Sequence, residues 1–92
     1  MIRSFAGKET EEIFNRRPGR RFSNIARAAL AKLIMIDNAR RIEDLMQPPG
    51  NRLEKLKGDR RGAWSMRINH RWRICFEWEN VNADRVEVVD YH

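Results

Sequence analysis

The spacing of hydrophobic residues changes from a helical to a twofold period near the middle of the chain. Before position 46, apolar residues recur every three or four positions, most regularly at Ile25, Ala29, Leu33 and Ile36, a spacing typical of an amphipathic helix. After position 52, apolar and polar residues alternate, as in strands with one buried face. Helices followed by consecutive strands predict an α+β fold, with two or three helices packed on one face of an antiparallel sheet.

The first half of the chain predicts two main helices. A short helix over residues 8–17 has glutamates in its first turn and Arg16 and Arg17 in its last, an arrangement that the helix dipole favours. A longer helix begins after an N-cap at Ser23 or Asn24. The other predicted features are a short N-terminal edge or partner strand over 2–5, the end of the long helix at 37–38, one or two helical turns over 41–46 and a loop over 47–51.

The second half predicts strands joined by short connections. The strand segments are 53–57, 64–68, 72–79 and 85–90, and the connections are 58–62, 69–71 and 80–82. Such short connections join antiparallel neighbours. Trp64 and Trp72 fall on the apolar face and are predicted to lie in the core. The opposite face carries Arg67, Arg73 and Glu77, so it is predicted to be exposed and largely basic.

Length and composition favour a single domain over residues 1–92, with one core. The one cysteine, Cys75, excludes an internal disulfide, and its place in an apolar strand suits a small hydrophobic residue. No apolar run has the length of a signal-peptide core or a membrane span, which predicts a cytoplasmic protein. Zinc-ligand spacings, phosphate-binding glycine loops and nucleophile elbows are missing, so no cofactor is expected.

Positive charge is concentrated between Asn51 and Arg73. This segment holds eight Lys or Arg and two acidic residues, an excess of six that equals the formal net charge of +6 of the whole chain. Localised cationic charge on a folded face favours a polyanionic partner, above all a nucleic acid. The alternative is a basic face that only keeps a small protein soluble. The cations predicted to contact RNA are Arg52, Lys55, Arg60, Arg61, Arg67 and Arg71.

Some of these residues also suit the cleavage of RNA without a metal. That reaction needs cations at the scissile phosphate, groups that transfer protons, and alignment of the 2′-hydroxyl with the phosphate. Lys57 and Arg73 suit the cationic role, and the candidates for proton transfer are Glu54, Asp90, Tyr91 and His92. The valines of the last strand draw the C-terminal triplet towards the sheet, although a frayed chain end remains the alternative.

Five short motifs follow one another along the whole chain. They are Met1 to Phe5, Leu56 to Arg60, Trp64 to Ile68, Trp72 to Ile74 and the triplet Asp90-Tyr91-His92. Together they resemble HigB toxins, the plasmid-maintenance killer proteins of the RelE superfamily. The resemblance implies a compact RelE-like domain. Each motif alone is weak, and the specificity comes from their order.

The resemblance implies a ribosome-dependent endonuclease that cleaves messenger RNA in the ribosomal A site through 2′-hydroxyl attack without a metal. It also implies a HigA-type helix-turn-helix antitoxin that binds the toxin and represses their operon, so that operator DNA is contacted through the antitoxin. By motif, Lys57 looks like a cation at the scissile phosphate and Arg73 like its partner in charge stabilisation. Asp90 and Tyr91 look like catalytic or substrate-orienting groups, and His92 is a further candidate.

Glu54 departs from the pattern of some relatives, which have a histidine at this position as a candidate for proton transfer. A carboxylate beside Lys55 and Lys57 is favoured in its charged form, so the identity of the general base stays open. A plain salt bridge between Glu54 and Lys57 is the alternative reading.

A second functional class is a non-catalytic RNA- or ribosome-binding module that uses the same basic sheet. It predicts salt-sensitive binding without a cleavage product, and it gives the C-terminal triplet no role. A DNA-binding repressor is disfavoured, because the long helix has only Arg27 and Lys32 as cations.

Overall fold

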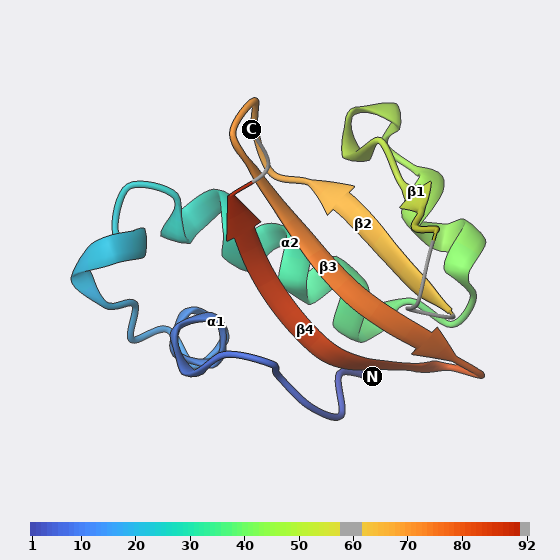
Figure 1. The fold of residues 1–92 in the computed structure, drawn as a ribbon, viewed down its shortest axis with the longest axis horizontal. Helices are drawn as coiled ribbons and strands as arrows, with labels where there is room; N and C mark the ends of the chain where they lie inside the picture. Colours follow the sequence, from blue (N-terminus) through green and yellow to red (C-terminus); the bar gives the residue numbers. More distant parts are fainter. Residues whose placement is uncertain (58–61, 91–92) are drawn as a thin grey trace.

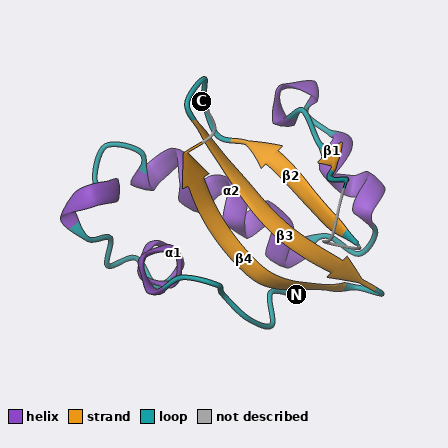
Figure 2. Ribbon diagram, in the orientation of Figure 1, coloured by secondary structure: helices purple, strands orange, loops and turns teal. Residues whose placement is uncertain are grey.

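The computed structural model describes residues 1–57 and 62–90 and shows helices packed against one face of an antiparallel sheet (Figures 1 and 2). The strands are β1 (Glu54–Lys55), β2 (Ala63–Arg67), β3 (Trp72–Glu79) and β4 (Asn82–Asp90), in the sheet order β1-β2-β3-β4. Each strand pairs antiparallel with the next. The predicted α+β meander is therefore confirmed. The predicted turn over 58–62 lies, apart from Gly62, outside the described residues.

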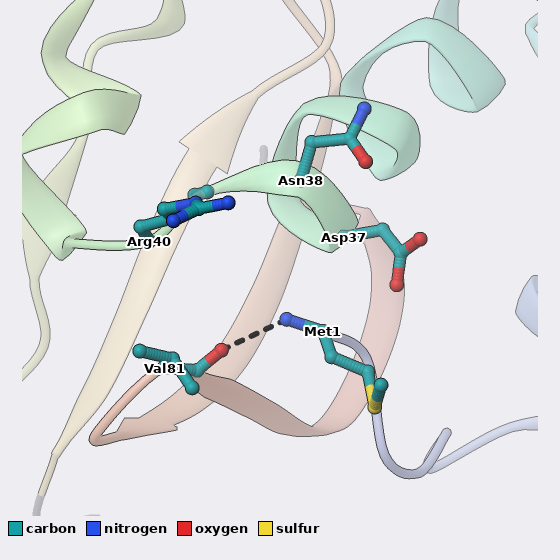
Figure 3. Close-up of a pocket in the computed structure, with 6 residues that line it drawn as sticks. Met1, Asp37, Asn38, Arg40 and Val81 are labelled. Carbon is teal, nitrogen blue, oxygen red and sulfur yellow. Dashed lines mark hydrogen bonds between the residues drawn. The ribbon is translucent and has the colours of Figure 1, made fainter.

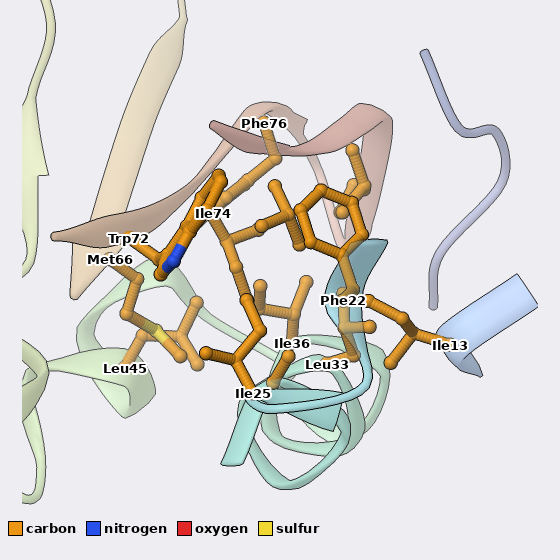
Figure 4. Close-up of a cluster of buried hydrophobic side chains, with 14 of the residues drawn as sticks. Ile13, Phe22, Ile25, Leu33, Ile36, Leu45, Met66, Trp72, Ile74 and Phe76 are labelled. Carbon is orange, nitrogen blue, oxygen red and sulfur yellow. The ribbon is translucent and has the colours of Figure 1, made fainter. Parts of the chain in front are cut away.

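The helical layer covers the sheet from one side. Its elements are α1 (Lys8–Phe14), η1 (Arg20–Phe22), α2 (Ala26–Asn38), η2 (Ile42–Met46) and η3 (Pro49–Asn51), where η marks a 3₁₀ turn. Leu33 and Ile36 of α2 are fully buried, as their spacing predicts. They lie under Ile74 and Phe76 of β3 in the core (Figure 4). In the described ranges, no helix has the length and apolar character needed to cross a bilayer.

The strand register assigns side chains to two faces of the sheet. Met66 and Ile74 are paired across β2 and β3 and point into the core. Ser65 and Cys75 are paired on the other face, because successive side chains of a strand alternate. A bulge interrupts the pairing of β3 with β4 near Arg85, whose φ of 53° is left-handed. Such bulges increase the local twist of a sheet.

Two predicted helix ends are wrong. The first helix was expected to reach about position 17, but α1 ends at Phe14. Arg16 has a φ of 63° and cannot continue a right-handed helix, so the two arginines lie beyond the last turn. The N-cap of α2 is Ile25, not Ser23 or Asn24. The Ser23 hydroxyl instead donates a hydrogen bond to the carbonyl of Arg20 (3.0 Å).

The N-terminal segment lies along β4 without forming the predicted strand. It makes two isolated parallel bridges, from Ile2 to Ala83 and from Phe5 to Val86. Between them, Arg3 donates from Nε to both carboxylate oxygens of Asp84 (3.1 and 3.2 Å). This segment is therefore attached to the sheet edge by backbone contacts and by the ion pairs of Arg3 with Asp84 and Glu79.

The sheet face opposite the helices is less exposed than predicted. Arg73 is 7% exposed, and Ser65 and Cys75 are buried beside it. β1 pairs with β2, and the chain just before β1 contacts Arg73 through the carbonyl of Arg52, which covers Arg73 at this end of the face. The expectation of an exposed Arg73 is therefore wrong. The core assignment of Trp72 is confirmed, since it is 9% exposed, and Trp64 is partly buried against the core.

Candidate active site

Arg73 is a buried cation that joins three segments of the chain. Its Nε donates to the hydroxyl oxygen of Ser65 on β2 (3.0 Å), and its Nη2 donates to the carbonyl oxygen of Arg52 (2.6 Å). The carboxylate of Glu54 on β1 lies 3.9 Å from the same Nη2. The planar guanidinium supplies donors in a fixed fork geometry, which suits several partners at once. The position of the charge is thereby fixed by Ser65 of β2 and by the chain at and just before β1.

The loop that reaches Arg73 is anchored by the side chain of Asn51, which is fully buried. Its amide nitrogen donates to the carbonyls of Leu45 (3.2 Å) and Gln47 (3.1 Å), and its amide oxygen accepts a hydrogen bond from Lys32 of α2. Arg52 follows with a left-handed backbone (φ 45°, ψ 54°), which turns the chain into β1. These contacts aim the Arg52 carbonyl at Arg73.

Glu54 lies at the edge of the sheet, beside Arg73. Glu54 pairs with Ser65 in the register of β1 and β2, and its side chain is 54% exposed. Lys57 follows two residues after β1 and is exposed. The ion-pair partner of Glu54 among the described residues is Arg73, so the alternative reading of a Glu54–Lys57 salt bridge is not borne out.

Asp90 lies on the other face of the sheet. It is opposite Trp72, whereas Arg73 is opposite Val89, and adjacent residues of a strand point to opposite faces. Its carboxylate accepts hydrogen bonds from Nε and Nη2 of Arg71 (3.1 and 3.0 Å). The structure therefore brings Glu54 to Arg73 but does not bring Asp90 to it. The predicted site residues Tyr91, His92, Arg60 and Arg61 lie outside the described residues.

The remaining cations predicted to contact RNA differ in their surroundings. Arg52 and Lys55 are exposed. Arg67 is partly buried, and its Nε donates to the carbonyl of Asn69 in the β2–β3 hairpin (3.2 Å). Arg71 is 53% exposed but is bound to Asp90, as described above. Within residues 1–57 and 62–90, no three metal-ligating side chains are grouped as in a metal site.

Sequence reasoning missed Ser65 and Asn51, which position the site. The detectable signal for Ser65 was a small polar residue in a strand, one step diagonally across from Arg73 once the hairpin register is set. Asn51 was read only as a loop residue. Its role depends on a contact with α2, which is distant in sequence, so no local pattern indicates it.

A hollow in the described surface is separate from this site. It has a volume of about 360 Å³ and is lined by Met1, Asp37, Asn38, Ala39, Arg40 and Val81 (Figure 3). The Met1 ammonium group donates to the carbonyl of Val81 across it (2.8 Å). It contains none of the residues predicted for RNA binding or catalysis.

A protein-family model and two curated proteins that resemble this chain all carry the name HigB. A family model described as RelE-like toxin of type II toxin-antitoxin system HigB matches residues 3–92. Toxin HigB-1 of Vibrio cholerae is 43% identical over 56 residues, which are 61% of this chain and 59% of that protein. Endoribonuclease HigB of Proteus vulgaris is 39% identical over 61 residues, 66% of this chain and 65% of that protein. Each match thus spans less than two thirds of the relative's length.

Comparison with solved structures concerns the fold alone. A YoeB-YefM complex from Staphylococcus aureus contains a chain that matches with a TM-score of 0.62 and 21% identity, over 100% of this chain and 95% of that one. A heterotetrameric complex of the YoeB-YefM toxin-antitoxin from the same organism matches with a TM-score of 0.60 and 17% identity, over 100% and 98%. The described residues therefore share the fold of a chain in these complexes.

Proposed function

Because the chain belongs to the HigB-like family of RelE-like toxins, we propose that it is the toxin of a type II toxin–antitoxin system and acts as an endoribonuclease. The observation that carries this proposal is the family match over residues 3–92. The name Endoribonuclease HigB, borne by the Proteus vulgaris relative, supports cleavage rather than binding alone. We extend the proposal to messenger RNA held in the ribosomal A site.

The proposed reaction is attack of the 2′-oxygen on the adjacent phosphorus. The bond from phosphorus to the 5′-oxygen breaks, the 2′-hydroxyl proton passes to a base, and an acid protonates the leaving oxygen. The pentacoordinate intermediate gains negative charge, which a preorganised cation stabilises. Arg73 suits this role because Ser65 and Arg52 already hold its guanidinium in place. Lys57, exposed beyond β1, is the proposed second cation.

The proposed proton-transfer groups are Glu54, Tyr91 and His92. Of these three, Glu54 belongs to the described residues, and its carboxylate oxygen lies 3.9 Å from Nη2 of Arg73. Its exposed carboxylate has room to approach a 2′-hydroxyl, which supports a role as base. Tyr91 and His92 supply a phenol and an imidazole directly after Asp90 in the chain. These assignments follow the motif and the proton requirements of the reaction.

The proposed RNA surface consists of the exposed cations near this site, Arg52 and Lys55, together with Arg67, Arg60 and Arg61. Contacts of this kind bind phosphates without reading sequence, so binding weakens as salt rises. The proposed protein partner is a HigA-type helix-turn-helix antitoxin, through which the operator DNA is contacted. A site of action on ribosomes places the protein in the cytoplasm.

Three single substitutions test the site. Lys57→Ala, Arg73→Ala and Tyr91→Ala are expected to relieve growth arrest on induction, since loss of one charge-stabilising or proton-transfer group typically costs about a hundredfold or more in rate. Arg27→Ala removes an exposed arginine of α2 and is the matched control, expected to remain toxic. Growth curves would be read beside circular dichroism of the purified variants. If all three folded variants arrest growth like the parent protein, the site assignment is wrong.

A further inference from the structure

Two arginine side chains lie over the ring of Trp72 at the start of β3. The guanidinium carbon of Arg71 is 4.8 Å from the centre of the Trp72 ring, and that of Arg21 is 5.8 Å from it. Each arginine is also bound to a carboxylate. Arg71 donates two hydrogen bonds to Asp90 (3.1 and 3.0 Å), and Arg21 donates one to Glu9 of α1 (2.9 Å).

The indole ring is held in place by the core. Trp72 is 9% exposed, and its ring meets that of Phe22 edge to face, with centres 5.2 Å apart and an angle of 87° between the planes. Phe22 itself is 3% exposed. Both rings belong to the core cluster (Figure 4). A guanidinium that stacks on so fixed an aromatic face loses less freedom when it binds a carboxylate. Arg71 is therefore preorganised to hold Asp90.

The charges of this cluster are balanced. Two guanidinium groups, Arg21 and Arg71, face two carboxylates, Glu9 and Asp90, so the formal charges cancel. A phosphate that bound Arg71 would have to displace the carboxylate of Asp90. Within residues 1–57 and 62–90, the exposed cations Arg52 and Lys55 form no ion pair with a carboxylate, which separates Arg71 from them. The cluster is better suited to fixing one part of the protein than to binding RNA.

The part that it fixes is the end of β4. Asp90 is opposite Trp72 in the strand register and is the last described residue, next to the β2–β3 hairpin (Figure 1). Tyr91 and His92 follow it directly in sequence. We propose that Arg71 is a positioning residue, which stacks on Trp72 and binds Asp90 to set where the segment carrying Tyr91 and His92 begins. This inference rests on the proposed function, in which these two residues transfer protons.

The inference predicts a defect in the chemical step. Displacing a reacting group by about 1 Å can cost a factor on the order of a hundred, so Arg71→Ala is expected to lower the single-turnover cleavage rate about tenfold or more. The half-saturating ribosome concentration should stay within about twofold, because the variant keeps the cations of the proposed RNA surface, to which Arg71, bound to Asp90, does not belong. Arg71→Lys keeps the charge but loses the planar two-donor contact. Its cleavage rate should therefore lie between those of the parent protein and Arg71→Ala.

A charge exchange and a matched control make the test specific. The double variant Arg71→Asp with Asp90→Arg restores an ion pair and is expected to recover part of the rate lost in each single variant. Asp90→Asn keeps an oxygen that can accept from Arg71, so its cleavage rate should fall less than that of Asp90→Ala. The control is Arg3→Ala, which removes a similar ion pair at the other end of β4 and should leave cleavage unchanged.

Hydrogen exchange gives a readout that does not depend on cleavage. Deuterium uptake by a peptide covering residues 87–90 should rise in Arg71→Ala and stay at the parent level in Arg3→Ala. If the parent protein does not cut RNA, the proposed function fails, while this measurement still tests the anchoring of β4. Unchanged uptake would overturn the inference. So would a higher half-saturating concentration with an unchanged rate, or no recovery in the double variant.

Discussion

At the scale of the residue, one guanidinium connects three segments at the candidate site. Arg73 of β3 donates to Ser65 of β2 and to the carbonyl of Arg52, and lies 3.9 Å from Glu54 of β1. Its charge type was evident from the sequence, but its burial was not. Burial depends on a loop more than twenty positions earlier in the chain, whose path is fixed by Asn51.

Arg73→Lys tests whether the fixed geometry of this group matters. A lysine keeps the positive charge but cannot reproduce the forked donation to Ser65 and Arg52. We expect cleavage to fall about tenfold or more, and stability to fall by about 1–3 kcal/mol because buried acceptors lose a partner. Urea denaturation and single-turnover cleavage would measure the two effects. A variant that matches the parent protein in stability and in cleavage rate would show that charge alone suffices. The control is Arg27→Lys, which makes the same change at an exposed position of α2.

At the scale of the element, β4 is attached to its surroundings at both ends by an arginine–aspartate pair. Arg3 binds Asp84 near its start, and Arg71 binds Asp90 at its end. The existence of α2, β3 and β4 was predictable because their apolar spacing extends over many residues. The ends of the helices were less predictable: α1 stops before Arg16, whose backbone is left-handed, and α2 begins after Ile25 and not after Ser23 or Asn24.

The pair at the start of β4 predicts an acid-dependent loss of stability. The hydrogen bond from Arg3 is the largest cause that holds the pKa of Asp84 below its ordinary value. The pair therefore contributes fully above the pKa of the unfolded chain, about 4, and its contribution is lost as the pH falls through the lower folded pKa. Between pH 5 and pH 2, the parent should lose more stability than Asp84→Asn, by up to about 1 kcal/mol for such an exposed pair.

Urea midpoints of both proteins at each pH would measure this difference. Asp44, whose pKa is lowered chiefly by the backbone amides of Arg40 and Arg41, contributes equally to both proteins and cancels. Equal losses in parent and variant would mean that the Arg3–Asp84 pair does not stabilise the attachment of the N-terminal segment.

At the scale of the whole molecule, the chain separates its charged groups by face. The cation Arg73 and the carboxylate of Glu54 lie on the face away from the helices, and the neutral cluster around Trp72 lies on the helical side. The sequence motifs identified the family and the fold correctly. They did not separate Asp90 from Arg73, because motif order carries no information about which face of a sheet a residue occupies.

The central claim is ribosome-dependent cleavage, and primer extension on a defined messenger RNA tests it most directly. The parent protein and Arg73→Ala would each be assayed with and without translating ribosomes. Discrete cuts that require ribosomes and are lost in the variant are the predicted result. Ribosome binding by the parent protein without any cut would contradict the proposal and would favour a non-catalytic RNA- or ribosome-binding module.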